Sequence, residues 1–386
     1  MSHCGDLDPV ETIAQERGRQ MTSENIAAHD AASDPVDRHR HQGADLAICH
    51  IDDPGWLRLV NRSHDATAFH IPAWSSAVSA TYGFPSFALA IRGADGWVAA
   101  GLPVMEVRDL LGRRALVSLP FTDHCPPLVD EEANLADVAI SVTRWRARGA
   151  TPSLEVRAEL PSIPDAVAQN VGTRHIVDLM SDPDALFHQL HRNRIQKRIR
   201  RARESGVEIT LSRSIDDLAT FYRLHCETRR RQGVPVQPRR FIQSIWERVI
   251  QPGYGFVILA KVQEAPIATG LFLTWNRHLI YKYGASDRAY WKLGANFLVH
   301  WTAMEWGCVN GYRTYDFGRT DAGHESLREF KAAWDSTEVP LVYTHLGNSP
   351  RALGRGHGAS VFNQIIRHSP TVVCRAVGEL LYRYAA

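Results

Sequence analysis

Residues 315–335 read YDFGRTDAGHESLREFKAAWD. The beginning of this stretch, with Thr314 before it, is rich in β-forming residues and predicts a strand over 314–320. The part from 325 to 335 places its apolar residues three and four positions apart, which predicts a short helix. Because only four residues join the two, the helix must fold back beside the end of the strand. We therefore expect polar side chains of the strand end and of the helix to lie together.

The rest of the chain predicts the same order of elements twice. From residue 45, the patterns predict a strand, two short helices, three strands, a helix ending at Gly149 and a strand over 153–160. From residue 181, they predict a basic helix and then the same order again, with a helix over 295–309 before the strand over 314–320. A further helix and a strand over 339–346 follow. This order predicts an α/β fold with mixed α+β sheets, one twisted and helix-flanked sheet in each half, and a cleft between the halves.

These patterns divide the chain into a leader (1–44), an N-terminal domain (45–180), a C-terminal domain (181–350) and an appendix (351–386). The leader carries four Arg against eight acidic residues, which is typical of a solvated, disordered tail, and Met21 offers an alternative start to Met1. The appendix predicts amphipathic helices that break near Ser369 and Pro370.

The amino-acid composition excludes several classes of protein and kinds of site. The 386 residues include 44 Lys and Arg against 42 Asp and Glu, so a strongly basic nucleic-acid coat protein is excluded. The six Cys form no close pair, so neither a zinc site nor a redox motif is predicted. The N-terminus does not have the basic start and apolar core of a signal peptide, and no apolar run has the length of a membrane span. We expect a cytoplasmic protein, in solution or peripheral to the inner face of the membrane.

Three motifs carry a resemblance to a known family: HRNRIQKRIRRARESGVEI (191–209), YDFGRT (315–320) and LREFKAAWD (327–335). They resemble the FemAB-type (FemABX) branch of the GNAT acyltransferase superfamily, which includes the BioF2-like acetyltransferase domain. The resemblance covers roughly Ile48 to Leu346 and is most specific in 188–347. It implies tandem GNAT-like domains. It also implies transfer of amino acids from aminoacyl-tRNA to a peptidoglycan precursor, or N-acyl transfer in cell-envelope or exopolysaccharide pathways.

The candidate catalytic residues are Asp316, Arg319 and Lys331. Ligands of open α/β sheets bind at strand ends, and the Arg fork suits phosphate or carboxylate, although an internal ion pair between Asp316 and Arg319 is the alternative. A partly desolvated Lys331 would stabilise the oxyanion of acyl transfer, whereas a surface lysine whose stem lies on apolar residues is its alternative. The resemblance implies that the Phe330–Lys331 pair lies at the acyl-donor site.

A run of seven basic residues in twelve, from Arg192 to Arg203, predicts a polyanion-binding helix, capped by Ser181 and closed by Gly206. Its partners would be RNA phosphates, a nucleotide-linked precursor or an anionic membrane, and a solvated linker helix is the alternative. No aromatic residues interleave the charges, which favours phosphate contacts without base readout, and we expect no double-stranded DNA partner. The expected contacts with substrate or donor are Asn193, Arg194 and Arg198.

The loop RAYWKLGANFL (288–298) departs from the coenzyme A pattern (Q/R)xxGx(G/A). Gly294 fits, but Trp291 takes the Gln/Arg place and Asn296 the second small position. The acyl donor is therefore acyl-CoA or aminoacyl-tRNA, and we expect no tightly bound cofactor and no metal. The remaining expected substrate contacts are Asp123, Glu155, Arg157, Tyr283 and Asn296. Cys125 follows His124 directly, so alternation along a strand would point the two side chains apart, which argues against a nucleophile there.

The sequence thus predicts an N-acyltransferase that moves an acyl or aminoacyl group to an amine of a cell-envelope acceptor, either a peptidoglycan precursor or an exopolysaccharide sugar amine. Such a reaction needs proximity and oxyanion stabilisation rather than a protein nucleophile. The alternatives are an acetyl-CoA-dependent sugar-amine N-acetyltransferase and a non-catalytic scaffold at the membrane surface.

Overall fold

The structure is a computed structural model that describes residues 45–109, 111–131, 133–148, 152–347, 364 and 366–385. The predicted leader and the first part of the predicted appendix lie outside the described residues. The described residues belong to one compact unit. Among them, no helix combines the length and the apolar character that crossing a membrane requires.

The first half contains the predicted order of strand, two helices, three strands, helix and strand. Its elements are β1 (Leu46–His50), α2 (Pro54–Arg62), α3 (Pro72–Tyr82), β2 (Ser86–Arg92), β3 (Val98–Arg108), β4 (Arg114–Val117), the short β5 (Leu128–Val129), α4 (Leu135–Ala147) and β6 (Ser153–Val156). The helix starts follow from the sequence. The Asp53 carboxylate caps α2 with Pro54 in the first turn, and the Asn134 side chain caps α4.

The second half repeats this order. Its elements are α5 (Pro183–Gln189), α6 (Lys197–Glu204), β8 (Glu208–Ser212), α7 (Leu218–Gln232), α8 (Arg239–Ile245), β9 (Gly255–Val262), β10 (Ala265–Trp275), β11 (His278–Ser286), α9 (Ala295–Val309), β12 (Thr314–Thr320), α10 (Glu325–Ala332) and β13 (Thr337–Leu346). The predicted bounds of α9 and β12 are confirmed. In each half, the last of the three consecutive strands pairs in parallel with the strand that follows the next helix: β4 with β6, and β11 with β12.

The prediction of mixed sheets flanked by helices is confirmed, but the prediction of a separate sheet in each half is wrong. The strands of the described residues form one continuous sheet in the order β1-β2-β3-β4-β6-β13-β7-β12-β11-β10-β9-β8. The joint is made by β13 and by β7 (Ala166–Asp178), a strand that the sequence patterns did not indicate. β13 pairs with β6 of the first half and with β7, which pairs in turn with β12 of the second half. The domain boundary near residue 180 stays a prediction.

A close approach of backbones at Gly172 holds this joint together. Gly172 lies within β7 at φ +150°, and a Cβ there would come within 2.3 Å of the Thr320 carbonyl oxygen at the end of β12. Only glycine allows the two strands to meet at this distance. The joint therefore fixes the end of β12 against the first half.

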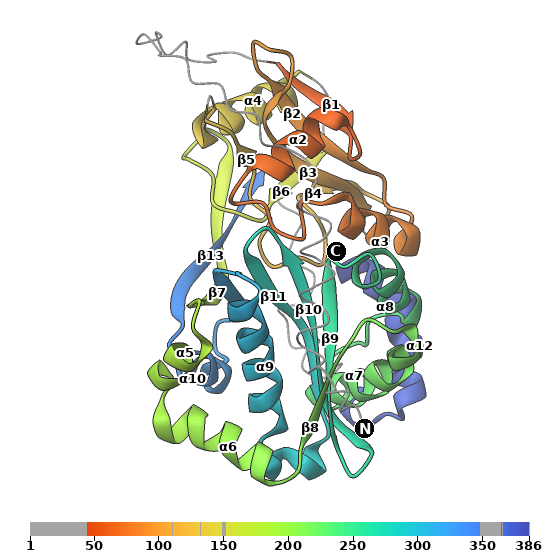
Figure 1. Ribbon diagram of the computed structural model, residues 1–386. Coiled ribbons are helices and arrows are strands. Elements are labelled where there is room, and N and C mark those ends of the chain that lie inside the picture. The colour runs from red at the N-terminus through yellow and green to blue at the C-terminus, as the bar shows by residue number, and fades with distance from the viewer. Residues whose placement is uncertain are drawn as a thin grey trace, which may run out of the picture. The chain divides into compact units, whose positions relative to one another are not determined.

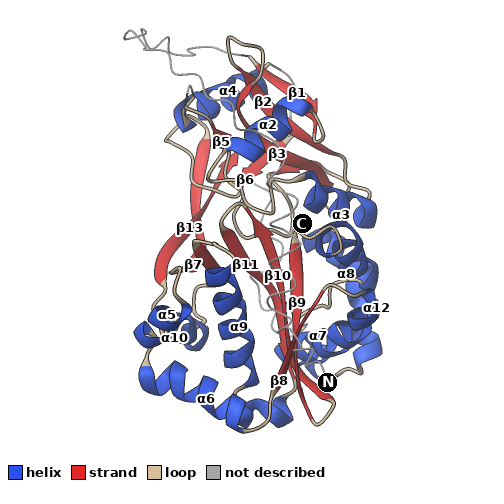
Figure 2. Ribbon diagram, in the orientation of Figure 1, coloured by secondary structure: helices blue, strands red, loops and turns tan. Residues whose placement is uncertain are grey.

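Helices cover both faces of the second half of the sheet (Figures 1 and 2). α9 packs on β9 and β10 from one side, and α7 packs on β10 and β11 from the other. The C-terminal helix α12 (Thr371–Leu381) begins after Pro370, near the predicted break, and packs against α7. Its Cys374 is fully buried, so one face of the predicted amphipathic appendix belongs to the core.

Candidate active site

An opening in the sheet separates β11 from β12. The two strands pair only where His278–Ile280 faces Thr314–Asp316. Beyond that point β11 carries a bulge, because Leu271 of β10 pairs with Tyr283 and Phe272 with Tyr281. Lys282 is the extra residue of this bulge, which re-aims its side chain.

A cavity of about 460 Å³, here called the central cavity, lies at this opening. Its walls come from the 121–123 segment of the first half, from α7, β11, β12 and α10 of the second half, and from the C-terminal segment. Five predicted site residues line it: Asp123, Arg157, Tyr283, Arg319 and Lys331. The predicted cleft between the halves is therefore present, although the sheet is continuous.

Lys331 joins α10 to the end of β12. Its Nζ donates hydrogen bonds to the carbonyl oxygens of Gly318 at 2.8 Å and Arg319 at 3.0 Å. The residue is 4% exposed. Burial lowers the pKa of Lys331 to about 8, against the opposing effect of the Asp123 charge. An ammonium carries three N–H donors, so one remains for a group in the central cavity.

Asp123 approaches the same end of β12 as Lys331. A Cβ on Gly318 (φ +71°) would come within 2.8 Å of Asp123 Oδ2, so only glycine leaves room for the carboxylate. Burial alone would raise the pKa of Asp123, but Lys282, the Arg319 amide and Lys331 hold it below its ordinary value. The carboxylate is therefore ionised and balances part of the lysine charge.

The segment before Asp123 carries backbone strain. Leu119 (φ 61°) and Phe121 (φ 62°) both occupy the left-handed region, which large L-residues rarely adopt. The Tyr343 hydroxyl donates to the Asp123 carbonyl oxygen at 2.8 Å. Strain of this kind persists only where surrounding contacts over-determine the backbone, and it is common at functional sites.

Arg157 holds the 121–123 segment in place through a hydrogen bond. Its Nη1 donates to the Thr122 carbonyl oxygen at 2.6 Å, and its Nε donates to Glu155 at 3.0 Å. Glu155 is thus paired with Arg157 and does not line the central cavity. The two residues are two positions apart along the chain, so they share one face of the extended segment.

Asp316 and Arg319 do not pair with each other. Asp316 accepts two hydrogen bonds from Arg174 of β7, at 2.7 and 3.0 Å, and one from the Gly318 amide at 2.8 Å. Arg319 pairs instead with Asp321. Asp316 is buried and does not line the central cavity, so its contacts position the YDFGRT turn rather than touch a ligand there.

A second cavity of about 320 Å³, here called the α9 cavity, lies at the N-terminus of α9. Three predicted residues line it: Arg198, Asn296 and Phe330. Trp291 also lines it, is half-exposed, and donates its indole N–H to Ser286 Oγ at 2.9 Å. The helix dipole and free amides make such an N-terminus attractive to anions. Consecutive residues of α10 thus face different cavities: Phe330 the α9 cavity and Lys331 the central one.

Residues 189–331 match the family of acetyltransferase (GNAT) domains. Among solved structures, FemX superposes with a TM-score of 0.63 at 14% identity and covers 79% of this chain and 98% of that chain. Residues 189–331 are thus similar to GNAT domains, and the fold of the described residues is similar to that of FemX.

Two further solved structures share the fold. L-PGS from Bacillus licheniformis has a TM-score of 0.51 at 11% identity, covering 83% of this chain and 99% of that chain. The C-terminal domain (DUF2156) of a candidate lysylphosphatidylglycerol synthetase from Agrobacterium fabrum has a TM-score of 0.51 at 13% identity. The match covers 81% of this chain and 95% of that chain. A search among curated proteins gave no significant match.

The basic helix of the GNAT domain is broken into pieces. Asp182, rather than the predicted Ser181, caps α5, because its side chain accepts from the Asp184 amide. The chain becomes extended at Leu190, and a π-helical turn over Arg192–Gln196 then leads into α6. The closure of α6 before Gly206 agrees with the prediction.

All seven basic side chains from Arg192 to Arg203 are exposed, while Ile195, Ile199 and Ala202 are buried. Arg194 pairs with Glu329 of α10 at 3.6 Å. Asn193 is exposed, and neither Asn193 nor Arg194 lines the two cavities. The basic surface therefore borders the α9 cavity through Arg198 only.

Three buried histidines and a buried thiol near the two cavities do not change their protonation state near pH 7. Burial lowers the pKa of His124, His225 and His300 to about 3, so all three are neutral at pH 7. Burial raises the pKa of Cys125 far above its ordinary value, which agrees with the expectation that it is no nucleophile. Among the described residues, no group of His, Cys, Asp and Glu could hold a metal ion.

The residues of the central cavity that sequence patterns missed include Lys282, Arg229 and Tyr382. Lys282 stands between two tyrosines in an otherwise apolar strand, which is the one signal that sets it apart. Arg229 is one of three consecutive arginines, and nothing local distinguishes it from its neighbours. Tyr382 belongs to the C-terminal segment, where the Gln237 amide donates to its hydroxyl at 2.8 Å.

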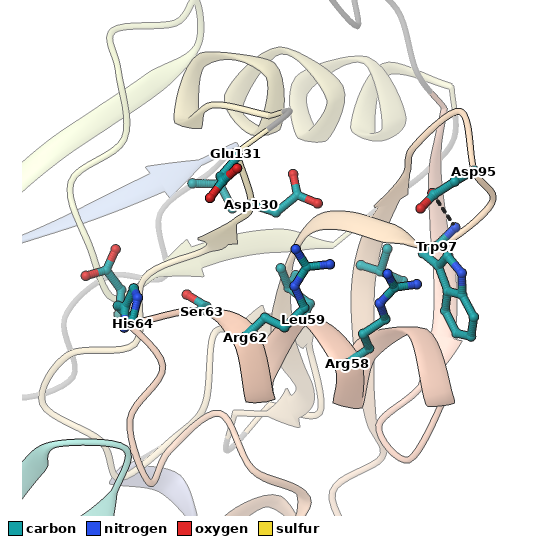
Figure 3. Close-up of a pocket in the computed structure, with 12 residues that line it drawn as sticks. Arg58, Leu59, Arg62, Ser63, His64, Asp95, Trp97, Asp130 and Glu131 are labelled. Carbon is teal, nitrogen blue, oxygen red and sulfur yellow. Dashed lines mark hydrogen bonds between the residues drawn. The ribbon is translucent and has the colours of Figure 1, made fainter. Parts of the chain in front are cut away.

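The first half carries a pocket of its own, of about 420 Å³ (Figure 3). Arg58 and Arg62 project into it from α2, and the Arg58 guanidinium lies 4.6 Å from the Trp97 ring. Asp130 and Glu131 line the same pocket. The lining of this pocket thus carries both signs of charge.

Proposed function

We propose that the protein is an N-acyltransferase that moves an acyl or aminoacyl group from a donor in the α9 cavity to an amine in the central cavity. The observation that carries this proposal is the position of α10 at the opening of the sheet. Phe330 faces one cavity and Lys331 the other, so a donor entering beside Phe330 can present its carbonyl carbon to an amine beside Lys331.

The chemistry needs no protein nucleophile. The neutral amine attacks the carbonyl carbon, a C–N bond forms, and negative charge develops on the carbonyl oxygen. The remaining N–H of Lys331 stabilises that oxyanion where water is scarce. When the intermediate collapses, the C–S or C–O bond to the donor breaks and the proton lost by the amine goes to the leaving group. Asp123 keeps Lys331 protonated through its charge.

The two donors that we consider for the α9 cavity are acyl-CoA and aminoacyl-tRNA, because both contain an adenosine beside a phosphate. Trp291 offers an exposed ring on which a base can stack, with the Arg231 and Arg288 guanidinium carbons 4.9 and 5.8 Å from the ring centre. The departure from the coenzyme A loop pattern at Trp291 and Asn296 favours aminoacyl-tRNA.

We propose that the acceptor belongs to the cell envelope. It is either a peptidoglycan precursor or a sugar amine of an exopolysaccharide. The likeness to FemX and to a candidate lysylphosphatidylglycerol synthetase supports this choice. Contact with an anionic membrane, through the basic helix and the exposed residues Val372 and Leu380 of α12, belongs to the same proposal.

Ligand-induced stabilisation tests this function. Acetyl-CoA, longer acyl-CoAs and charged tRNA are each added to the full chain, and the melting temperature is followed, because a ligand that binds only the folded state raises it. Donors that raise it are then incubated with amine acceptors, and amide products are sought by mass spectrometry. We expect one donor class to stabilise the chain and to yield an amide. If no donor stabilises the protein and no amide forms, the proposed function is wrong.

The basic surface gives a separate prediction about the donor. Reversing three exposed charges together, by Arg194→Glu, Arg198→Glu and Arg201→Glu, should weaken tRNA binding about tenfold or more at low salt. The slope of log affinity against log salt should also flatten, because fewer counterions are released. Fluorescence anisotropy with labelled tRNA measures both quantities.

The matched control makes the same change of net charge in the first half, by Arg58→Glu, Arg62→Glu and Arg144→Glu. This control should retain affinity within about twofold, since only residues that contact phosphates release counterions. Equal losses in both triple variants would mean that net charge alone attracts the tRNA, and unchanged affinity in the first would make the helix a solvated linker.

A further inference from the structure

The walls of the central cavity carry unbalanced positive charge. Arg157, Arg229, Lys282, Arg319 and Lys331 all line it, and Asp123 is the one acidic residue in its lining. Glu155 pairs with Arg157, and Asp321 pairs with Arg319, so these two charges are neutralised outside the cavity. Three cations then face one carboxylate. Such an excess in a partly desolvated space is costly unless a ligand of opposite charge binds there.

Neither Arg229 nor Lys282 makes an ion pair with a carboxylate of the described residues. The Nε of Arg229 donates only a long hydrogen bond, of 3.4 Å, to the Pro235 carbonyl oxygen. The Nζ of Lys282 lies 5.4 Å from the ring centre of Phe69 and 5.5 Å from that of Trp74, so aromatic faces contact the ammonium, and Asp123 is the carboxylate that acts on it most. These are the two cations whose charge the protein leaves available.

Arg229 and Lys282 line the same cavity from two elements that pack against each other, α7 and β11. Burial lowers the pKa of Lys282; the charges of Asp123 and Asp316 oppose this effect, and those of Arg157 and Arg229 add to it. Arg229 therefore adds positive charge to a space in which Lys282 is already desolvated.

We propose that Arg229 and Lys282 form an anion subsite in the central cavity, which binds a carboxylate or phosphate group carried by the amine acceptor. Arg supplies a planar fork and Lys a point charge, a pairing that suits either oxyanion. The identification of the ligand as the acceptor rests on the proposed function. Anion binding at the subsite, by contrast, requires no acyl donor. The acceptor is therefore an amine that also carries an acidic group, held with its amine toward Asp123 and Lys331.

Binding of simple anions tests the subsite without any acyl donor. Isothermal titration at low ionic strength uses two probes, inorganic phosphate and succinate, with chloride as the blank; the probe that binds more tightly tells whether phosphate or carboxylate is preferred. Arg229→Gln and Lys282→Met should each weaken binding about tenfold or more, as expected for a charged hydrogen bond. Lys282→Arg should retain most of the affinity.

Matched controls separate a local effect from a general loss of charge. Arg230→Gln changes the exposed neighbour of Arg229 on the same helix, and Lys261→Met makes the lysine change on β9, outside the cavities described. Both should bind anions within about twofold of the parent chain, and circular dichroism checks that every variant is folded. Absence of anion binding to the parent, or equal losses in controls and site variants, overturns the subsite.

A comparison of acceptors separates this inference from the proposed function. Anion binding that depends on Arg229 and Lys282, with no amide formed from any donor, would leave the subsite standing and refute acyl transfer. Acyl transfer that is as efficient with neutral amines as with amines carrying a carboxylate or phosphate would leave the function standing and refute the subsite.

Discussion

Lys331→Met is expected to lower kcat by about 10²–10³-fold while changing the acceptor KM much less. The charge of Lys331 is needed mainly when the carbonyl oxygen becomes negative, and loss of one oxyanion-stabilising group typically costs this much. Steady-state kinetics, with the donor and acceptor found by the stabilisation screen proposed above, measure both constants. Lys261→Met, the same change outside the cavities described, should leave kcat within about twofold.

The structure adds a cost that the sequence did not reveal. Lys331 donates hydrogen bonds to the carbonyl oxygens of Gly318 and Arg319, and methionine leaves these acceptors without their donor. We expect the free energy of unfolding to fall by about 1–3 kcal/mol, with the fold retained. Denaturant titration measures this loss, and kinetics are then compared at a temperature where both proteins are folded.

The pH profile separates a charged Lys331 from a merely structural one. Because its pKa is lowered to about 8, turnover that needs the protonated form should decline as the pH rises through about 8. Between this value and the pKa of about 10.4 in the unfolded chain, the folded state binds fewer protons, so stability should rise with pH there. Lys331→Met should lose both features. A parent profile with no decline above pH 8 would contradict the proposed role of the charge.

Asp123→Asn should move the alkaline decline of turnover to lower pH by about one unit or more. Asp123 is the foremost of the charges that keep Lys331 protonated, and loss of an opposite charge at close range typically shifts a pKa by about that much. The asparagine oxygen can still accept from the Arg319 amide, so the YDFGRT turn should keep its geometry. We expect turnover at pH 8 to fall by about fivefold or more, because the protonated fraction of Lys331 falls by that factor when its pKa drops by about one unit.

Asp335→Asn provides the matched control for this variant. Asp335 is exposed after α10, at φ +60°, a conformation that asparagine tolerates, and it lines neither the central nor the α9 cavity. Its profile should coincide with that of the parent chain. If Asp123→Asn left the alkaline decline in place while lowering turnover, Asp123 would act on the acceptor directly and not through Lys331.

Much of the fold could be predicted because its signals are local. The order of elements, the bounds of α9 and the strand over 314–320 follow from periodicity, caps and glycines within a few residues. The Phe330–Lys331 pair could be found in the same way, because a short connection forces α10 back onto the end of β12. The two cavities that this pair faces could not be found from the sequence.

The sequence by itself determined which segments become helices and strands, because hydrophobic periodicity and capping act between near neighbours. The tertiary structure alone decided how those segments join and which charges meet. The first part of β7 is largely polar and exposed, so no alternation of apolar and polar residues predicts this strand. Its partners β12 and β13 lie far along the chain. Asp316 pairs with Arg174, which lies 142 residues away in the sequence, rather than with its near neighbour Arg319. Lys282 reaches the cavity because a bulge turns it there, and Arg229 lines the same cavity because α7 packs on β11. Long-range pairing depends on which surfaces pack together, and no local pattern encodes that choice.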